Sequence, residues 1–244
     1  MSAERIPRGV LVAATLLGVA TIALSSLTLF DFWWYLASGQ RILQTHSIPK
    51  TDPFSYTAEG RPWVNHMWAT QVLFTLLWEQ WGRYALIGLK TATIVATFWI
   101  VLGTMRARGV HPLLASAVTL LAAWTGAEFW HARPQMFTYL FVAVLIWLLR
   151  PGWEHRRVLL ALVPALVVLW VNLHAGFMMA FLVIGLIGLG TALPALATTA
   201  ISPSSAVSPA TRQPAGRRAG STSAGNAVPR PIRPMTRNAI MNPA

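Results

Sequence analysis

Long apolar stretches alternate with short polar segments along most of this chain. The first stretch, Val10–Leu29, holds twenty residues without a charge, enough for one bilayer crossing at about 1.5 Å per residue. Five further stretches share this character, although the fourth and fifth are short for a perpendicular crossing. Together they predict membrane-spanning helices at Val10–Leu29, Tyr84–Met105, Pro112–Ala127, Met136–Leu149, Val158–Trp170 and Gly176–Leu196. The pattern is typical of an all-α integral membrane protein with about six transmembrane helices.

The first outer loop, residues 31–83, contains two shorter runs that also predict helices. Phe32–Leu43 follows Asp31 and has the character of a short amphipathic helix. Met67–Trp81 is apolar and aromatic but too short to cross the membrane comfortably, which favours a helix lying at the interface. The segment Phe32-Trp33-Trp34-Tyr35 forms an aromatic belt of the kind that marks a membrane–water boundary.

Composition supports the membrane class. The chain is 55% hydrophobic and only 11% charged, with a mean hydropathy of +0.53, which excludes a soluble domain of this length. It contains no cysteine, so disulfides and thiolate metal sites are excluded. The net charge of +12 does not indicate nucleic acid, because six arginines lie in an acid-free tail and most other basic residues flank apolar stretches.

Basic residues also predict the orientation. Arginine clusters precede the first span, join spans two and three, and join spans four and five; they are Arg5, Arg8, Arg106, Arg108, Arg150, Arg156 and Arg157. With six alternating spans all of them lie on one side, which the positive-inside rule makes cytoplasmic, as it does both termini. A cleavable signal peptide is the rival interpretation of residues 1–30. It is disfavoured because the apolar run exceeds a usual signal core and no small-x-small site precedes Asp31.

The C-terminal region differs from the rest of the chain. No aromatic residue follows Phe181, and residues 197–244 are rich in Ala, Ser, Pro and Arg. Such a segment cannot bury enough apolar surface to offset its conformational entropy, so we expect a multi-span module over residues 1–196 and a disordered basic tail over 197–244. The tail would attract anionic lipid headgroups, or it is a solvated extension or an out-of-frame ending of a longer gene.

Several outer-face residues suit the chemistry of group transfer. Asp31 is the first candidate, because a carboxylate at the membrane boundary can act as a general base towards an acceptor hydroxyl. The alternative is an N-cap for the helix that follows it. Asp52 could bind a metal or a sugar hydroxyl, but Asp52-Pro53 favours a role in an Asx-turn.

Four basic residues, Arg61, His66, His131 and Arg133, are candidates to bind a phosphate leaving group, since preorganised cations stabilise developing negative charge. The alternative is that the arginines extend towards lipid headgroups while the histidines cap helix ends. Secondary candidates at the same face are Glu128, Asn172 and His174. No metal site is expected, because the histidines lack close ligand spacing, and the chain has no P-loop, GxGxxG or GxSxG motif.

Five segments of the chain resemble a group of bacterial multi-span proteins that look related to the GT-C glycosyltransferases. They are Asp31–Gly39, Ile48–Tyr56, Gly60–Trp68, Arg133–Gln135 and Trp170–Gly176, and the resemblance covers about residues 8–190. It implies a GT-C-like N-terminal module in the bacterial cytoplasmic membrane, which transfers a sugar with inversion from a polyprenyl-phosphate donor to an acceptor at the outer face. It also implies that Asp31 is the catalytic acid of the first outer loop.

The chain departs from this group in two ways. Many relatives have paired acids where this chain has Asp31-Phe32, so a divalent cation is left open as a cofactor. They also have more spans and a longer C-terminal part, which implies a truncated chain and leaves an inactive fragment as one expectation. A non-catalytic membrane scaffold or assembly partner is the main alternative function. A transporter is less favoured, because only Lys90 lies clearly within a span, near its outer end.

Overall fold

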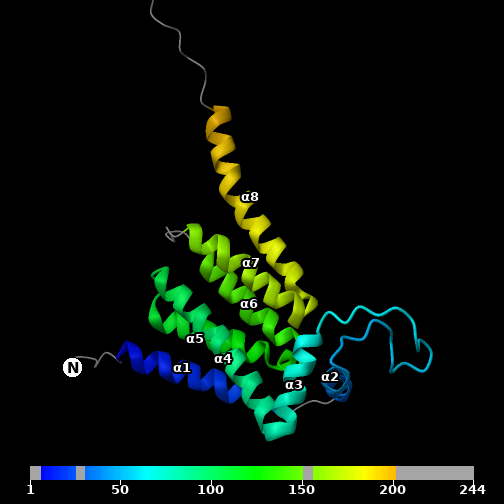
Figure 1. Cartoon of the computed structure of the whole chain (residues 1–244). Helices are drawn as coiled ribbons and strands as arrows, with labels where there is room; N and C mark the ends of the chain where they lie inside the picture. Colours follow the sequence, from blue (N-terminus) through cyan, green and yellow to red (C-terminus); the bar gives the residue numbers. More distant parts are fainter. Residues whose placement is uncertain (1–6, 26–30, 151–155, 202–244) are drawn as a thin grey trace, which may run out of the picture. The chain divides into compact units, whose positions relative to one another are not determined.

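The computed structural model describes residues 7–25, 31–150 and 156–201, and these residues are organised almost entirely as helices. The α-helices are α1 (Arg8–Ala23), α2 (Phe32–Thr45), α3 (Trp68–Trp81), α4 (Arg83–Ala107), α5 (Pro112–Thr125), α6 (Gln135–Leu148), α7 (Arg156–Leu173) and α8 (Met178–Ile201) (Figure 1). Two short 3-10 turns, η1 (Ala127–Phe129) and η2 (Ala175–Phe177), precede α6 and α8. The described residues contain no strand, only an isolated bridge between Thr51 and Pro62.

The all-helical prediction is confirmed, and a helix forms in each of the six apolar stretches and in both runs of the first outer loop. Two helix ends differ most from the prediction. Helix α1 stops at Ala23, short of the predicted Leu29, and residues 26–30 lie outside the described part of the chain. Helix α8 continues to Ile201, past the predicted boundary at Leu196. The prediction of a disordered tail falls mainly on residues 202–244, which also lie outside the described part.

Two helical segments are long and apolar enough to cross a membrane, judged by length and composition. They are Arg83–Ala107, with 25 residues, and Ala175–Leu193, with 19. The other apolar helices are shorter: Arg8–Ala23, Pro112–Thr125, Gln135–Leu148 and Val158–Leu173. Only 6% of the apolar window in Ala175–Leu193 is buried inside the protein, so most of this apolar surface is not covered by other helices.

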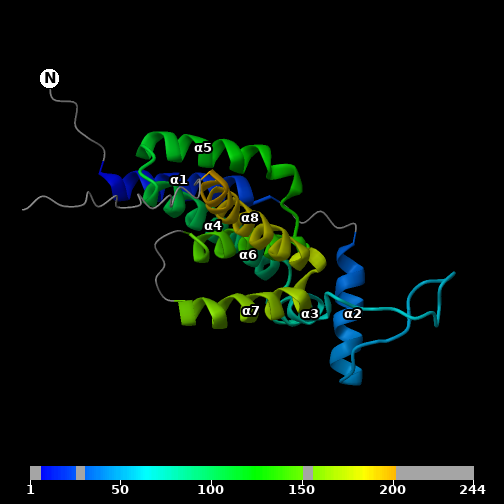
Figure 2. The ribbon, with the colours of Figure 1, turned by 90° about the horizontal axis from the view of Figure 1, so that it is seen from above.

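Helix α4 contacts α1 and α5 as well as α3 and α6, so it links two groups of packed helices. Helix α1 lies beside α5 (Figure 2), and a small core that includes Val19, Ile94 and Trp130 fills the space among these elements. A larger core joins α2, α3, α6, α7 and the start of α8, with Phe74, Leu145 and Trp170 among its most buried side chains. This second core supports the polar residues described below.

Close packing of α2 on α3 depends on Gly39. Its α-carbon faces the backbone of α3 so closely that an added Cβ would lie 2.3 Å from the carbonyl oxygen of Gln71 and 2.3 Å from Thr75 Oγ1. Thr75 Oγ1 donates a hydrogen bond to the carbonyl oxygen of Leu36 across the same interface (3.2 Å). The two helices are therefore in near backbone contact, which fixes where α2 begins.

The segment between α2 and α3 extends outward from the helices (cyan in Figure 1) and returns on itself. Asp52 stabilises its turn, because Asp52 Oδ1 accepts hydrogen bonds from the backbone N–H groups of Phe54 (2.8 Å) and Ser55 (3.0 Å). The Asx-turn predicted for Asp52 is confirmed. The returning part of the segment is held by a hydrogen bond from the Asp52 N–H to the carbonyl oxygen of Arg61 (2.9 Å). Trp63 then packs its ring against Trp34 of α2.

Candidate functional site

The candidate base and one candidate phosphate ligand form an ion pair. Arg133 Nη2 lies 3.1 Å from Asp31 Oδ2, although the two residues are far apart in sequence. Asp31 immediately precedes α2, and Arg133 lies two residues before Gln135, the first residue of α6. The Asp31 side chain is 52% exposed and that of Arg133 is 28% exposed, so a ligand from outside can reach both groups.

The N-cap alternative for Asp31 holds for its position but not for its side chain. It occupies the N-cap position of α2, but its side chain makes no capping hydrogen bond. An N-cap residue typically has β-region dihedrals that direct its side chain to the first free N–H groups. Asp31 instead has φ −99° and ψ 0°, and its carboxylate pairs with Arg133.

Tyr35 lies one helical turn after Asp31 and completes this cluster. Its ring is buried and packs edge-on against Phe74. Burial raises the pKa of the Tyr35 hydroxyl, and the charge of Asp31 raises it further against the opposing effect of Arg133. The hydroxyl therefore stays protonated near neutral pH. Tyr35 was predicted only as part of the aromatic belt, although its i+4 spacing from Asp31 indicates a shared helix face.

His174 is held by a hydrogen-bond network from three elements. Trp170 Nε1 of α7 donates to Thr138 Oγ1 of α6 (3.0 Å), and Thr138 Oγ1 lies 2.8 Å from His174 Nδ1. The backbone N–H of Gly176 in η2 donates to the same Nδ1 (2.9 Å). Burial lowers the pKa of His174, and the proximity of His66 lowers it further. Thr138 and Trp170 were not singled out from the sequence, although Trp170 is spaced one helical turn before His174.

Asn172 serves to join helices. Its Oδ1 accepts a hydrogen bond from Trp68 Nε1 of α3 (2.8 Å), and its Nδ2 donates to the carbonyl oxygen of Val168 (2.7 Å). Nearby, Thr70 Oγ1 of α3 donates to the carbonyl oxygen of Leu173 (2.8 Å). These bonds attach the beginning of α3 to the end of α7, which places the His174 turn next to the segment that carries His66.

The remaining sequence candidates are less closely connected. Arg61 is exposed in the segment between α2 and α3, Glu128 is exposed in η1, and His131 is partly buried beside Arg133. Their side chains form no ion pair or hydrogen bond with any other residue that the structure describes. The hydrogen bonds of its turn hold the pKa of Asp52 below its usual value, chiefly through the Ser55 hydroxyl. The structure thus pairs Asp31 with Arg133 and places His66 near His174, but it does not draw Arg61, His131, Glu128 or Asp52 into either group.

At Asp31 the protein offers a divalent cation a single carboxylate, which is paired with the guanidinium group of Arg133. Magnesium can bind through one carboxylate when waters and substrate phosphates supply its other ligands. In the part of the chain that the structure describes, no three His, Asp or Glu side chains are grouped to share a metal ion.

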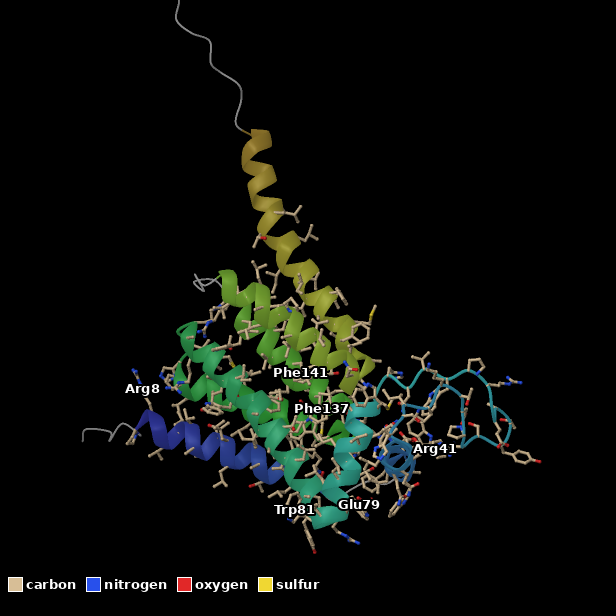
Figure 3. The ribbon with its side chains drawn as sticks, viewed as in Figure 1. Arg8, Arg41, Glu79, Trp81, Phe137 and Phe141 are labelled. Carbon is tan, nitrogen blue, oxygen red and sulfur yellow. The ribbon has the colours of Figure 1, made fainter. Side chains whose placement is uncertain are left out.

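A shallow groove of about 410 Å³ lies between α2 and α3, with Trp33, Trp78 and Glu79 among its walls. Figure 3 shows Glu79 and Arg41 at this end of the molecule, away from Arg8 at the start of α1, with Phe137 and Phe141 in the interior between them. The groove and the Asp31 pair are therefore both supported by α2.

Comparison with protein-family models, with curated proteins and with solved structures gives no significant match to this chain.

Proposed function

We propose that this chain is a GT-C-like glycosyltransferase of the bacterial cytoplasmic membrane, which transfers a sugar from a polyprenyl-phosphate donor to an acceptor at the outer face. The observation that carries the proposal is the Asp31–Arg133 pair. It unites a carboxylate suited to proton abstraction with a guanidinium suited to phosphate, the two groups that such a transfer requires.

Membrane insertion is part of the proposal. The six apolar helices α1, α4, α5, α6, α7 and α8 would cross the bilayer, with both termini cytoplasmic and the Asp31 and His174 groups on the outer side. The exposed apolar surface of Ala175–Leu193 supports contact with lipid, because water would solvate such a surface poorly. Helices α5 and α6 have 14 residues each, so they span about 21 Å and would require local thinning of the bilayer.

The proposed reaction assigns one step to each charged group. The acceptor oxygen attacks the anomeric carbon of the donor sugar while Asp31 takes the hydroxyl proton. The bond between the anomeric carbon and the phosphate oxygen breaks, and its electron pair leaves with the phosphate. Arg133 stabilises the charge that develops there, and attack from the opposite face inverts the anomeric centre.

The test is the variant Asp31→Asn, assayed for sugar transfer from a polyprenyl-phosphate sugar in liposomes. An amide retains a hydrogen-bond acceptor for Arg133 but cannot take a proton near neutral pH, so transfer should fall by about 10²–10⁴. The ion pair is half-exposed, so its loss should cost at most about 1 kcal/mol of stability.

Asp52→Asn is the matched control, since it removes an exposed carboxylate whose structural role an amide oxygen can still fill. It should leave transfer nearly unchanged. Full transfer by Asp31→Asn would contradict the base assignment. A wild-type protein that is folded but transfers no sugar from any polyprenyl-phosphate donor would favour the scaffold alternative.

A further inference from the structure

The hydrogen bonds around His174 determine which of its ring nitrogens carries the proton. Thr138 Oγ1 already accepts the Trp170 N–H, which leaves the hydroxyl proton of Thr138 free to point at His174 Nδ1. The Gly176 N–H points at the same nitrogen. Because an N–H at Nδ1 would face the Gly176 N–H, Nδ1 must be the acceptor and the proton must lie on Nε2.

Gly176 is required for this arrangement. A Cβ at this position would lie 2.1 Å from Thr138 Oγ1 and 2.7 Å from His174 Nδ1, so no other residue lets the backbone N–H approach the ring in this way. The titratable neighbour of the His174 ring is His66, which lies in the segment before α3. The neighbours from α6 and α7 are Thr138 and Trp170, which carry no charge. Burial of the ring and the proximity of His66 both lower the pKa of His174.

The outward nitrogen of His174 is available to a ligand. Nε2 has no hydrogen-bond partner among the residues that the structure describes, and it is not one of the unpartnered polar atoms that are closed off from solvent. Three elements fix the tautomer of the His174 ring, and its remaining N–H is unpaired and reachable. The ring is therefore preorganised to donate one hydrogen bond.

We propose that His174 is a substrate-binding residue, which donates its Nε2–H as a neutral imidazole to a phosphate oxygen of the lipid-linked donor. This assignment rests on the proposed function for the identity of the lipid, but the phosphate chemistry follows from the surroundings. Thr138, which orients His174, lies in the first turn of α6, five residues after Arg133 in the sequence. Arg133 supplies positive charge, and His174 supplies a directed N–H without adding a charge.

The first experiment measures the tautomer of the intact protein. The full chain, labelled with ¹⁵N-histidine in detergent micelles, is examined by two-bond ¹H–¹⁵N correlation, and His174→Gln assigns the signal. The neutral Nε2–H form is expected at pH 7 and should persist as the pH falls through the usual histidine range near 6.5. An Nδ1–H tautomer or an imidazolium at pH 7 would overturn the proposal. This result comes from the wild-type protein, so it does not depend on whether a variant folds.

The second experiment tests the ligand with farnesyl phosphate and with farnesol, which has the same chain but no phosphate. Farnesyl phosphate should shift the Nε2 resonance and bind roughly 10–100-fold more weakly to His174→Gln, the loss expected for a hydrogen bond to a charged group. His111→Gln is the control, because His111 is exposed at the start of α5 and its side chain makes no capping bond.

The outcomes separate this proposal from the proposed function. An equal shift with farnesol, or unchanged affinity in folded His174→Gln, would overturn the phosphate assignment. Loss of farnesyl phosphate binding in His174→Gln supports it even if Asp31→Asn proves fully active, since that result would remove the base assignment alone.

Discussion

Gly39→Ala should destabilise the protein, although helix propensity predicts the opposite sign. Alanine in place of glycine inside a helix ordinarily stabilises by about 0.5–1 kcal/mol. Gly39 lies in the interior of α2, so propensity alone predicts a gain. The tertiary structure opposes it, because the new Cβ would lie 2.3 Å from the backbone oxygen of Gln71.

The magnitude follows from the atoms involved. Ordinary contact between a Cβ and a neighbouring atom needs about 3.4–4 Å, so α2 and α3 must separate by about 1 Å or more, and a backbone carbonyl cannot rotate away as a flexible side chain can. Overpacking of this kind costs about 1–3 kcal/mol. For a chain of this size, 1 kcal/mol corresponds to roughly 2–4 °C in the unfolding midpoint, so we expect a decrease of several degrees.

Thermal unfolding of the detergent-solubilised protein provides the measurement, with Gly88→Ala of α4 as the control. Gly88 has no atom within 4 Å of its added Cβ, so the same substitution there should leave the midpoint unchanged or raise it. The separation of α2 from α3 should also displace Asp31 from Arg133 and reduce sugar transfer. An unfolding midpoint for Gly39→Ala equal to or above that of Gly88→Ala would refute the reasoning.

Two further predictions concern the outer segments. Asp52→Ala removes the acceptor of the Asx-turn, so proteolysis between residues 46 and 67 should accelerate while the unfolding midpoint stays constant; a lower midpoint would mean that the turn supports the helices. The pKa of Asp52 is lower in the folded protein than its unfolded value of 3.8. The carboxylate therefore stabilises the turn fully above pH 3.8, and this stabilisation is lost as the pH falls through the lower folded pKa. Proteolysis by pepsin across that pH range measures the loss. Reporter fusions at Glu59 and Glu128 should read outside and a fusion after Ala200 should read inside; a cytoplasmic signal at Glu59 would invert the proposed topology.

The helices could be predicted because the signal for them is local. Apolar runs of sufficient length favour helices regardless of what they later contact, and helices formed at Phe32–Thr45 and Trp68–Trp81 as well as in the longer stretches. The Asx-turn at Asp52 is equally local, since its acceptor and donors lie within three residues. Helix ends were less predictable, as α1 shows, because hydrophobicity does not specify where a helix stops.

The candidate site could be predicted only as a set of residues on one face. Asp31 and Arg133 both appeared as candidates, but their pairing needed the positions of α2 and α6, and the sequence left capping of α2 as an alternative role for Asp31. Tyr35 and Thr138 were missed because an aromatic belt residue and a helical threonine have common structural roles, and their partners come from other elements.

The sequence by itself determined the helical segments, their apolar character and the turn at Asp52, because each depends on residues close together in the chain. The tertiary structure alone decided that Asp31 faces a guanidinium and that His174 accepts hydrogen bonds at Nδ1. The physical reason is that a charge or a tautomer depends on the groups within a few ångströms. Those groups lie on other elements, among them α6, α7 and η2. The close packing at Gly39 and the buried aromatic core hold these elements next to one another.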